Sequence, residues 1–325
     1  MIETKNFRTK SEYHARENVM VDNTWGMALD IGYSSVKGFS PNSAFCFPSY
    51  AKIMDKQQLN LGFKKENEII FENHKNGEKW LVGASAQDML STHDTTESEE
   101  AIYGRHRYSS PMFKVVAATG LGLGMLTNQY GSSDGKTLLL QTGLPPKYLK
   151  ADKKSLKKAL AGDHDFSITI GNVTQRMTFT LPEENISVMA QPLGTLLSIS
   201  TDNKGRLIKD AIKYTTSNVL IFDAGFGTLD TFDLRNRFVE NQETSDEVGM
   251  KAVLEETKTQ IFNKYGEDVS VVAMQKVLED GFIVMFDEEN MISEKIEIAD
   301  ILEEANEKIC DKAIAKVKEY TSSLR

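Results

Sequence analysis

Few residues in this sequence are of the kinds that form disulfides, metal sites or breaks in helices. Of 325 residues, 2 are cysteine, 5 are histidine and 7 are proline. Cys46 and Cys310 lie far apart and form no CxxC pair, so neither a disulfide framework nor a zinc finger is indicated. The histidines have no metal-ligand spacing and no Gly-x-Ser-x-Gly is present, which leaves zinc enzymes and serine hydrolases without support. We expect a protein of the reducing cytoplasm.

The sequence also lacks a long apolar run. A membrane-spanning helix needs about 20 consecutive apolar residues, and the best candidate, 115–126, is short and contains three glycines. Residues 1–17 are polar and charged, without the apolar centre of a signal peptide. We therefore expect no membrane association, and we interpret the residues before Val21 as a polar arm that is disordered or orders late.

Positive charge is in the minority. The chain has 38 lysines and arginines against 47 aspartates and glutamates, which gives a net charge of −9. A long basic groove for nucleic acid is therefore not expected, and DNA would be reached through a partner. The remaining composition, 40% hydrophobic and 26% charged residues, is typical of a globular chain, and a length of 325 residues predicts two domains.

Short apolar runs and helical periodicities alternate along the chain, which predicts an α/β fold. The expected strands are 25–31, 36–40, 44–47, 68–72, 78–82, 136–142, 166–170, 174–181, 186–190, 218–222 and 229–234. The expected helices are 83–90, 111–126, 148–160, 192–199, 249–265, 269–278 and 299–320, with a surface loop at 91–100. Apolar residues recur at helical spacing in the last helix, and we expect a sheet to cover that face.

Two segments of the chain match each other. They are Leu29-Asp30-Ile-Gly32-Tyr33-Ser34-Ser35-Val36 and Phe222-Asp223-Ala-Gly225-Phe226-Gly227-Thr228-Leu229. Each consists of a strand, Asp, any residue, Gly, small or polar residues, and a second strand. Backbone N–H groups of such a turn can bind phosphate oxygens, and an Asp at the strand end can face a metal ion or its waters. A single copy is a common hairpin turn, whereas two copies, one opening each half, favour a phosphate site.

Two further side chains are candidates for the same site. Lys37 follows Asp30 by seven residues, where an ammonium could neutralise phosphate charge; the alternative is a solvated strand lysine. Gln191 stands between a strand and a helix and could orient an attacking water, and the alternative is an ordinary helix-entry residue. The glycine-rich stretches 120–124 and 131–137 match neither the dinucleotide fingerprint nor the P-loop, so we interpret them as close helix packing and a loop.

Paired Asp-x-Gly hairpins with a Gln at a strand-to-helix junction between them resemble the actin/Hsp70/sugar-kinase superfamily. Three further stretches look like the plasmid-segregation actin-like proteins of the ParM/StbA type: Phe47-Pro-Ser49, Gln141-Thr-Gly143-Leu-Pro145 and Val188-Met-Ala-Gln191-Pro-Leu-Gly194-Thr-Leu-Leu197. The similarity covers about 25–325 and is strongest over 188–231. It implies a two-domain, ribonuclease H-like α/β fold with a nucleotide cleft between the domains.

The resemblance also implies roles for the candidate residues. Asp30 and Asp223 would face Mg²⁺ through its waters, and Gln191 would position the hydrolytic water, so that these three form the expected catalytic set. The phosphates would lie against Gly32, Tyr33, Ser34, Ser35, Lys37, Gly225, Phe226, Gly227 and Thr228. The implied activity is hydrolysis of ATP, with GTP as the alternative, coupled to the lifetime of filaments that move plasmids apart.

The same resemblance divides the chain into a polar arm at 1–24, a first actin-like domain at 25–213 and a second at 214–325. In the family, a helix such as 299–320 precedes an apolar strand and a Gly-Gly loop that contacts adenine and ribose, and this sequence ends at Arg325. We therefore expect a second domain without the adenosine loop, which would weaken nucleotide binding and polymerisation.

The leading hypothesis is a nucleotide-dependent, actin-like filament protein of the cytoplasm. It would bind its own copies and a basic, DNA-bound adaptor of the ParR type, without direct contact to nucleic acid or membrane. The alternative is a polymerising or adaptor protein of the same fold with little or no nucleotide turnover. A small-molecule kinase of this fold needs a catalytic base, usually Asp, near the transferred phosphoryl group, and none stands out between the hairpins.

Overall fold

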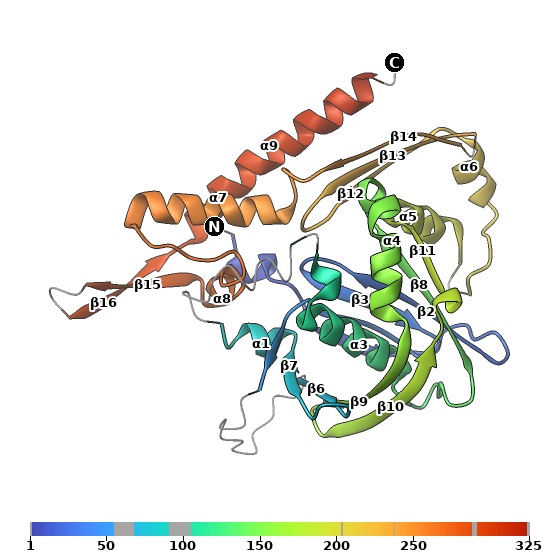
Figure 1. Ribbon diagram of the computed structural model, residues 1–325. Helices are drawn as coiled ribbons and strands as arrows, with labels where there is room; N and C mark the ends of the chain where they lie inside the picture. The colour runs from blue at the N-terminus through green and yellow to red at the C-terminus, as the bar shows by residue number, and fades with distance from the viewer. Residues whose placement is uncertain are drawn as a thin grey trace.

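The computed structural model describes residues 2–54, 68–90, 104, 106–202, 204–236, 238–287 and 291–323. Within these residues the strands form four sheets, and helices pack on and between them (Figure 1). The α/β class predicted from the alternating sequence pattern is confirmed. The predicted surface loop at 91–100 lies outside the described residues.

The largest sheet belongs to the first half of the chain. Its strand order is β1 (Glu12–Ala15), β4 (Ser43–Pro48), β3 (Ser35–Ser40), β2 (Thr24–Ile31), β8 (Thr137–Leu144) and β11 (Ile186–Ala190). Every second residue of β2 from Trp25 to Ile31 is buried, as the two-residue period of a strand requires. Strands β2, β8 and β11 run parallel, so their carboxyl ends meet at one edge of the sheet.

A second sheet and one helix complete the first core. The sheet order is β10 (Val173–Leu181), β9 (Gly162–Ile170), β6 (Ile69–Asn73), β7 (Lys79–Val82) and β5 (Ala51–Ile53). Helix α3 (Pro111–Met125) is capped by Ser110, whose hydroxyl accepts a hydrogen bond from the Phe113 N–H. A Cβ at Gly120 would lie 2.8 Å from Leu29, and one at Gly122 would lie 2.6 Å from Ile168. The glycines of this helix therefore allow close packing, as the sequence predicted.

A third sheet opens the second half. It has the order β12 (Val219–Ala224), β13 (Leu229–Arg235) and β14 (Phe238–Ser245). Helix α5 (Gln191–Ser200) covers one face of it through a cluster of Ala190, Leu196, Ile221, Phe232 and Leu234. Helices α4 (Pro146–Leu160) and α6 (Ala211–Thr216) lie on either side of α5 in the sequence. Helix α5 contacts both β11 of the first half and β12 of the second, so these contacts do not separate two domains. The domain boundary between residues 213 and 214 stays a prediction.

The last part of the chain has its own core. Helices α7 (Met250–Tyr265), α8 (Met274–Asp280) and α9 (Ala299–Ser323) surround buried side chains such as Leu254, Ile261 and Leu302, and the hairpin β15 (Phe282–Asp287) and β16 (Ile292–Glu297) extends from them (Figure 1). The expectation that a sheet covers the apolar face of the last helix is correct only near its end. Helix α7 packs against the first turns of α9, and Tyr320 contacts the Phe222 ring of β12.

The polar arm predicted at 1–24 is not disordered. Residues Thr4–Phe7 form the short helix η1, and β1 pairs with β4 and so forms one edge of the large sheet. The Tyr13 ring stacks on Phe45, and Ile2 and Phe7 pack against the core of the second half. The first part of the arm is thus held by Ile2, Phe7 and Tyr13, whereas Val19, Met20 and Val21 remain exposed.

The chain also has two short helical turns, η2 (Arg107–Ser109), which precedes α3, and η3 (Glu183–Asn185), which precedes β11. Arg107 of η2 lies at the site described below. Helix α1 (Ala84–Gln87) follows β7. Across the described part of the chain, no helix combines the length and the apolar character that a membrane crossing requires.

Candidate functional site

The two matched segments form two hairpins with the same turn. In the first, β2 ends after Asp30 and the Gly32 N–H donates to the Ser35 carbonyl oxygen at 2.9 Å. In the second, β12 ends after Asp223 and the Gly225 N–H donates to the Thr228 carbonyl oxygen at 2.8 Å. We call these the first hairpin and the second hairpin. Their turns present backbone groups at the ends of two sheets that lie in different halves of the chain.

The two hairpins line one cavity of about 390 Å³. All the site residues predicted from the sequence lie along it: Asp30, Gly32, Tyr33, Ser34, Ser35, Lys37, Gln191, Asp223, Gly225, Phe226, Gly227 and Thr228. Eight other residues complete the lining: Arg107, Tyr108, Gly143, Pro145, Tyr148, Gly194, Thr195 and Asp230. The fold thus brings together side chains that are nearly 200 residues apart in the sequence, and the volume is in the range of small-molecule sites.

Gln191 is held against the first hairpin. Its Nε2 donates to Asp30 Oδ1 at 2.8 Å, although the two residues are 161 positions apart. The contact follows from the parallel order of β2, β8 and β11, because Asp30 lies in β2, one residue before its end, and Gln191 follows β11 at the same sheet edge. Gly143, at the end of β8 between them, leaves the space that the Gln191 side chain occupies, since a Cβ there would lie 2.9 Å from Gln191 Cγ.

Three carboxylates line the cavity, those of Asp30, Asp223 and Asp230. Burial raises the pKa of Asp223, the negative charge of Asp30 raises it further, and Lys37 partly opposes both. Burial raises the pKa of Asp230 to about 6, although hydrogen bonds from Thr244 and Thr228 act in the opposite direction. Acidic groups that sit close together in a shielded cavity favour a bound cation, which would relieve their repulsion.

The arrangement fits a magnesium ion that keeps most of its waters. Among the described residues, no group of three or more His, Cys, Asp or Glu side chains could hold a metal directly. Mg²⁺ is commonly bound by one or two carboxylates together with waters and substrate phosphates. Asp30 and Asp223, one from each hairpin, line the same cavity and could supply such a pair.

Each hairpin turn is supported from behind by different groups. In the first, the Arg107 guanidinium donates to the carbonyl oxygens of Ile31 at 2.7 Å and Gly32 at 3.3 Å, and the Ser49 hydroxyl donates to Gly32 at 2.8 Å. Arg107 is 8% exposed and stacks on the Tyr33 ring at 4.4 Å. Its Nε has no hydrogen-bond partner among the described residues. A buried cation therefore lies directly beneath the first turn.

In the second hairpin, the start of α7 replaces the arginine. The N–H groups of Met250 and Lys251 donate to the carbonyl oxygens of Gly225 and Phe226 at 3.3 and 2.7 Å. The hairpins also touch across the cavity, because a Cβ at Gly227 would lie 2.6 Å from the Tyr33 ring. The N–H groups of a helix start have no partner within the helix and carry partial positive charge, so both turns rest on positively polarised groups.

Sequence reasoning missed Arg107 and Asp230. A signal for Asp230 was present, because Asp230 follows Asp223 by the same seven positions that separate Lys37 from Asp30. Each pair faces across its hairpin ladder. No comparable signal marks Arg107, whose contacts with the first turn span 75 and 76 positions.

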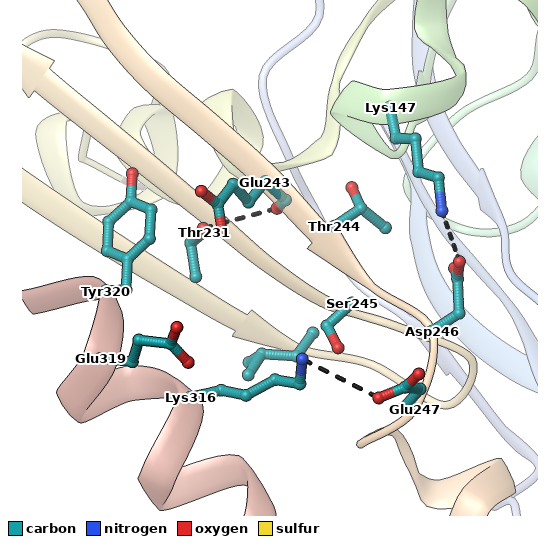
Figure 2. A pocket seen from close by; sticks show the side chains of 11 residues that line it. Lys147, Thr231, Glu243, Thr244, Ser245, Asp246, Glu247, Lys316, Glu319 and Tyr320 are labelled. Atoms are coloured by element: carbon teal, nitrogen blue, oxygen red, sulfur yellow. Dashed lines mark hydrogen bonds and ion pairs between the residues drawn. The ribbon is translucent and has the colours of Figure 1, made fainter. Parts of the chain in front are cut away.

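A larger cavity of about 490 Å³ lies between α9 and the third sheet, and none of the predicted site residues lines it (Figure 2). Its charged side chains are mostly paired with one another. Lys147 contacts Asp246 at 2.6 Å and Lys316 contacts Glu247 at 3.9 Å. The converging polar groups of both halves are found instead in the smaller cavity, which is therefore the candidate site.

The family is shown by a sequence model rather than by geometry alone. The model described as the actin-like proteins N-terminal domain matches residues 28–194, which include the first hairpin and Gln191. The chain belongs to the actin-like proteins. Among curated protein sequences, none matches this chain. The resemblance predicted from the paired hairpins is thus confirmed at the level of the family.

Solved structures agree with this assignment of the fold. The actin-like protein is similar to a ParM described as the pCBH non-polymerisable quadruple mutant, with 21% identity, a TM-score of 0.65, and coverage of 90% of this chain and 83% of that one. A 15-stranded ParM filament from Clostridium botulinum gives 21% identity, the same coverage and a TM-score of 0.64. An archaeal actin homolog gives 15% identity, a TM-score of 0.59, and coverage of 91% and 82%. The predicted two-half, actin-like architecture is therefore confirmed for the fold.

Proposed function

We propose that this actin-like protein is a nucleoside triphosphatase that assembles with its own copies into filaments. The observation that carries the proposal is the single cavity to which both Asp-x-Gly hairpins contribute, with Gln191 hydrogen-bonded to Asp30 inside it. Filament assembly is supported by the structural similarity to a ParM that was solved as a filament. Filament formation is a property of that ParM, and we extend it to this chain as a proposal. Segregation of plasmid DNA is the cellular role that we propose on the same grounds.

The chain's own groups can be assigned to the steps of hydrolysis. Backbone N–H groups of the two turns would bind phosphate oxygens, and Lys37 and Arg107 supply positive charge to the same cavity. Asp30 and Asp223 would hold Mg²⁺ through its waters, and the bound ion would neutralise charge on the phosphates. Gln191 would orient the attacking water with its carbonyl oxygen, while its amide group stays fixed on Asp30 at 2.8 Å.

The proposed partners follow from the charge of the chain. With a net charge of −9, the protein is expected to bind a basic adaptor of the ParR type, itself bound to DNA, rather than DNA directly. Mobility-shift measurements of the purified protein with plasmid DNA at 50 and 300 mM salt test this. Tight, salt-sensitive DNA binding without an adaptor would contradict the proposed division of roles.

Hydrolysis and assembly are tested together. Phosphate release and light scattering, with electron microscopy, are followed with Mg-ATP, Mg-GTP or no nucleotide, for the wild type, Gln191→Ala and the control Gln129→Ala. Gln129 is exposed and does not line the cavity. We expect Gln191→Ala to lower phosphate release by about 100-fold, because the attacking water loses the group that orients it, and to leave nucleotide binding within about threefold.

Three outcomes separate the hypotheses. Nucleotide-dependent filaments, with release lost only in Gln191→Ala, support the proposal. Filaments that form at the same rate with and without nucleotide, and with phosphate release at background, would favour a polymerising protein with little turnover. A protein that neither binds nucleotide nor assembles would overturn the proposed function.

A further inference from the structure

The first residues of the chain run from one half of the molecule to the other. We call residues 2–15 the N-terminal strap. Its beginning packs on the second half, because Ile2 and Phe7 contact the core formed by α7, α8 and α9. Its end belongs to the first half, because β1 pairs with β4 in the large sheet. The strap is thus anchored at both ends, once in each half.

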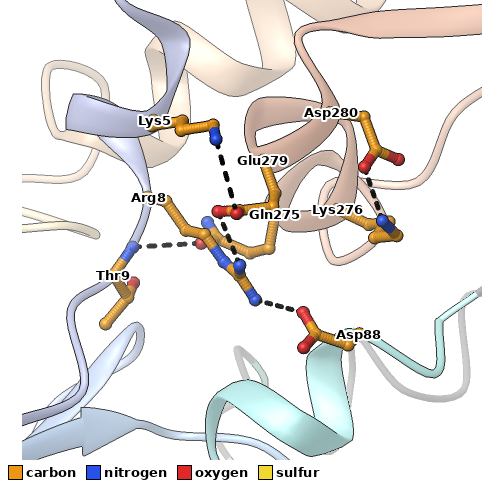
Figure 3. Close-up of polar contacts among 8 residues, drawn as sticks. All are labelled: Lys5, Arg8, Thr9, Asp88, Gln275, Lys276, Glu279 and Asp280. Carbon is orange, nitrogen blue, oxygen red and sulfur yellow. Dashed lines mark hydrogen bonds and ion pairs between the residues drawn. The ribbon is translucent and has the colours of Figure 1, made fainter.

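Arg8 lies in the middle of the strap and contacts both halves at once (Figure 3). Its Nη1 donates to Glu279 Oε2 of α8 at 2.8 Å, and its Nη2 donates to Asp88 Oδ1, directly after α1, at 2.6 Å. The side chain is 12% exposed. Burial alone would lower the pKa of Arg8, but the hydrogen bonds and charges of Glu279 and Asp88 outweigh it, so the net pKa is raised. The bridge is therefore charged at any physiological pH.

The strap reaches the border of the candidate site. The Thr9 N–H donates to Gln275 Oε1 at 3.2 Å, which ties the strap to α8 a second time. Thr9 and Gln275 line a narrow gap together with Tyr33 and Ser34 of the first hairpin. On the same side, Val272 of the second half packs into a cluster with Tyr50, Leu81, Ala86 and Leu90 of the first half. The strap therefore crosses the two halves next to the cavity, where they already touch.

Each hairpin belongs to a different sheet, so the distance between the hairpins depends on the contacts that cross from one half to the other. Charge-assisted hydrogen bonds of a shielded guanidinium are strong and directional, and an arginine can hold two carboxylates in fixed positions. Removing one partner leaves a charge in a poorly solvated place, which is costly. A two-sided bridge at this point therefore resists separation of the halves.

We propose that the N-terminal strap, with Arg8 as its positioning residue, holds the two halves at the separation at which both hairpins contact one nucleotide. The inference rests on the proposed function, since it concerns the same cavity. In this proposal Arg8, Asp88 and Glu279 do not contact the nucleotide. They fix the position of α1 relative to α8, and through these helices they fix the positions of the sheets that carry the hairpins.

The first test measures how fast nucleotide leaves the site. A fluorescent ATP analogue with Mg²⁺ is chased with unlabelled Mg-ATP, and dissociation is followed for the wild type, Arg8→Ala, Asp88→Asn and the double variant. We expect each single variant to release the analogue about tenfold faster, and the double variant also about tenfold faster, because both changes break one bridge. Arg8→Lys keeps the charge but lacks the fork, so it should recover only part of the effect.

Lys5→Ala is the matched control. Lys5 lies on the same strap and contacts Glu279 at 3.8 Å, but its side chain is 68% exposed and its ion pair does not reach the first half. Its release rate should stay within about twofold of the wild type. If Arg8→Ala lowers the melting temperature while nucleotide dissociation keeps the wild-type rate, the strap only stabilises the fold and the proposal is wrong.

A second measurement works without nucleotide. Spin labels are placed on the first half at Asn76→Cys and on the second half at Glu294→Cys, both exposed positions, with Cys46→Ser and Cys310→Ser to remove the native thiols. Pulsed electron resonance should give longer and broader distances in Arg8→Ala than in the parent, and no change in Lys5→Ala. An unchanged distance distribution in Arg8→Ala would overturn the proposed role of the strap even if the protein binds nucleotide. A wild type that binds no nucleotide, together with a distribution that lengthens in Arg8→Ala, would overturn the proposed function and leave the positioning of the halves supported.

Discussion

The two Asp-x-Gly hairpins share a turn and differ in charge. Both close with a Gly N–H bonded to the carbonyl oxygen three residues later, and both place a side chain opposite the Asp on the returning strand. In the first hairpin that side chain is Lys37, which is exposed. In the second it is Asp230, which is buried, and burial raises its pKa to about 6. Local sequence therefore sets the turn, while one opposite position sets the charge that the turn brings to the cavity.

The groups behind the turns differ as well. Arg107, a single side chain from a distant segment, holds two carbonyl oxygens of the first turn. The backbone at the start of α7 holds two carbonyl oxygens of the second. A side chain can be removed by one substitution, whereas a helix start can only be displaced. The first hairpin should therefore be easier to disrupt than the second, and the following changes test this.

The largest effect is expected from Arg107→Met. The change keeps much of the volume but leaves buried carbonyl oxygens of Ile31 and Gly32 without this donor, which should reduce the free energy of unfolding by about 3 kcal/mol. Urea unfolding measures it. Arg176→Met is the control, since Arg176 forms a solvent-exposed pair with Asp165 and its loss should reduce stability much less. Equal losses in both variants would show that the guanidinium is not the support of the first turn.

A smaller loss is expected when the support of the second turn is pushed away. In Gly249→Ala the new methyl group would overlap the Phe226 carbonyl oxygen and lie 2.9 Å from the Thr228 nitrogen, so α7 or the turn must shift. We expect a loss of about 2 kcal/mol in the free energy of unfolding and weaker nucleotide binding. Gly26→Ala has open space around the new methyl group and serves as the control. A stable Gly249→Ala protein with normal binding would mean that the second turn does not depend on the helix start.

Asp230→Asn should raise the free energy of unfolding of the nucleotide-free protein, in contrast to the two losses above. The pKa of Asp230 is about 6 in the folded chain and about 3.9 in an unfolded one, so the folded protein keeps a proton that the unfolded chain releases. The resulting loss of stability develops as the pH rises from about 4 to about 6 and reaches about 3 kcal/mol above pH 7. Asp230→Asn removes the ionisable group, so we expect about 2 kcal/mol more stability at pH 8 and a flatter profile between pH 4 and 6.

Asp233→Asn on the same strand is the counterpart of that variant. Asp233 is also buried, but it accepts a hydrogen bond from Arg235 at 3.2 Å, so its loss should destabilise the protein at pH 8. Thermal unfolding of both variants from pH 4 to 8 distinguishes the two cases. A destabilised Asp230→Asn protein at pH 8 would mean that the hydrogen bonds from Thr228 and Thr244 matter more than the cost of the buried charge.

Much of the site is local in the sequence, and that part was predictable. The strand, Asp, Gly and returning strand of each hairpin are contiguous, and Gln191 marks itself as a polar residue at a strand-to-helix junction. Asp230 could have been found by applying the seven-residue spacing of the first hairpin to the second. Arg107 could not, because a lone arginine carries no periodicity and its partners are backbone atoms of a distant turn.

The fold follows the same division. Strands with buried alternate residues, such as β2, were predicted to within one residue. Strand β14 was missed because most of its residues are exposed and polar, so no apolar alternation marks it. The strap was misjudged for a related reason. Arg8 and Thr9 are polar residues whose order comes from Asp88, directly after α1, and from residues of α8, about 80 and 270 positions away. Order that depends on pairing across the fold has no local signature.

The smallest effect, on nucleotide binding, is expected from Lys37→Gln. This change removes the positive charge that distinguishes the first hairpin from the second. Lys37 lowers the pKa of Asp223, but burial and Asp30 have larger effects on that group. Its ammonium is exposed, so its attraction for phosphate is screened by salt. We expect Lys37→Gln to weaken Mg-ATP binding about threefold at 50 mM salt and by less than about 1.5-fold at 500 mM.

Lys114→Gln, an equal charge change on exposed α3 surface outside the cavity, is the control in a titration by calorimetry. A loss of binding that persists at high salt would instead place Lys37 in direct, shielded contact with the nucleotide, and the first hairpin would then differ from the second in its ligand as well as in its charge.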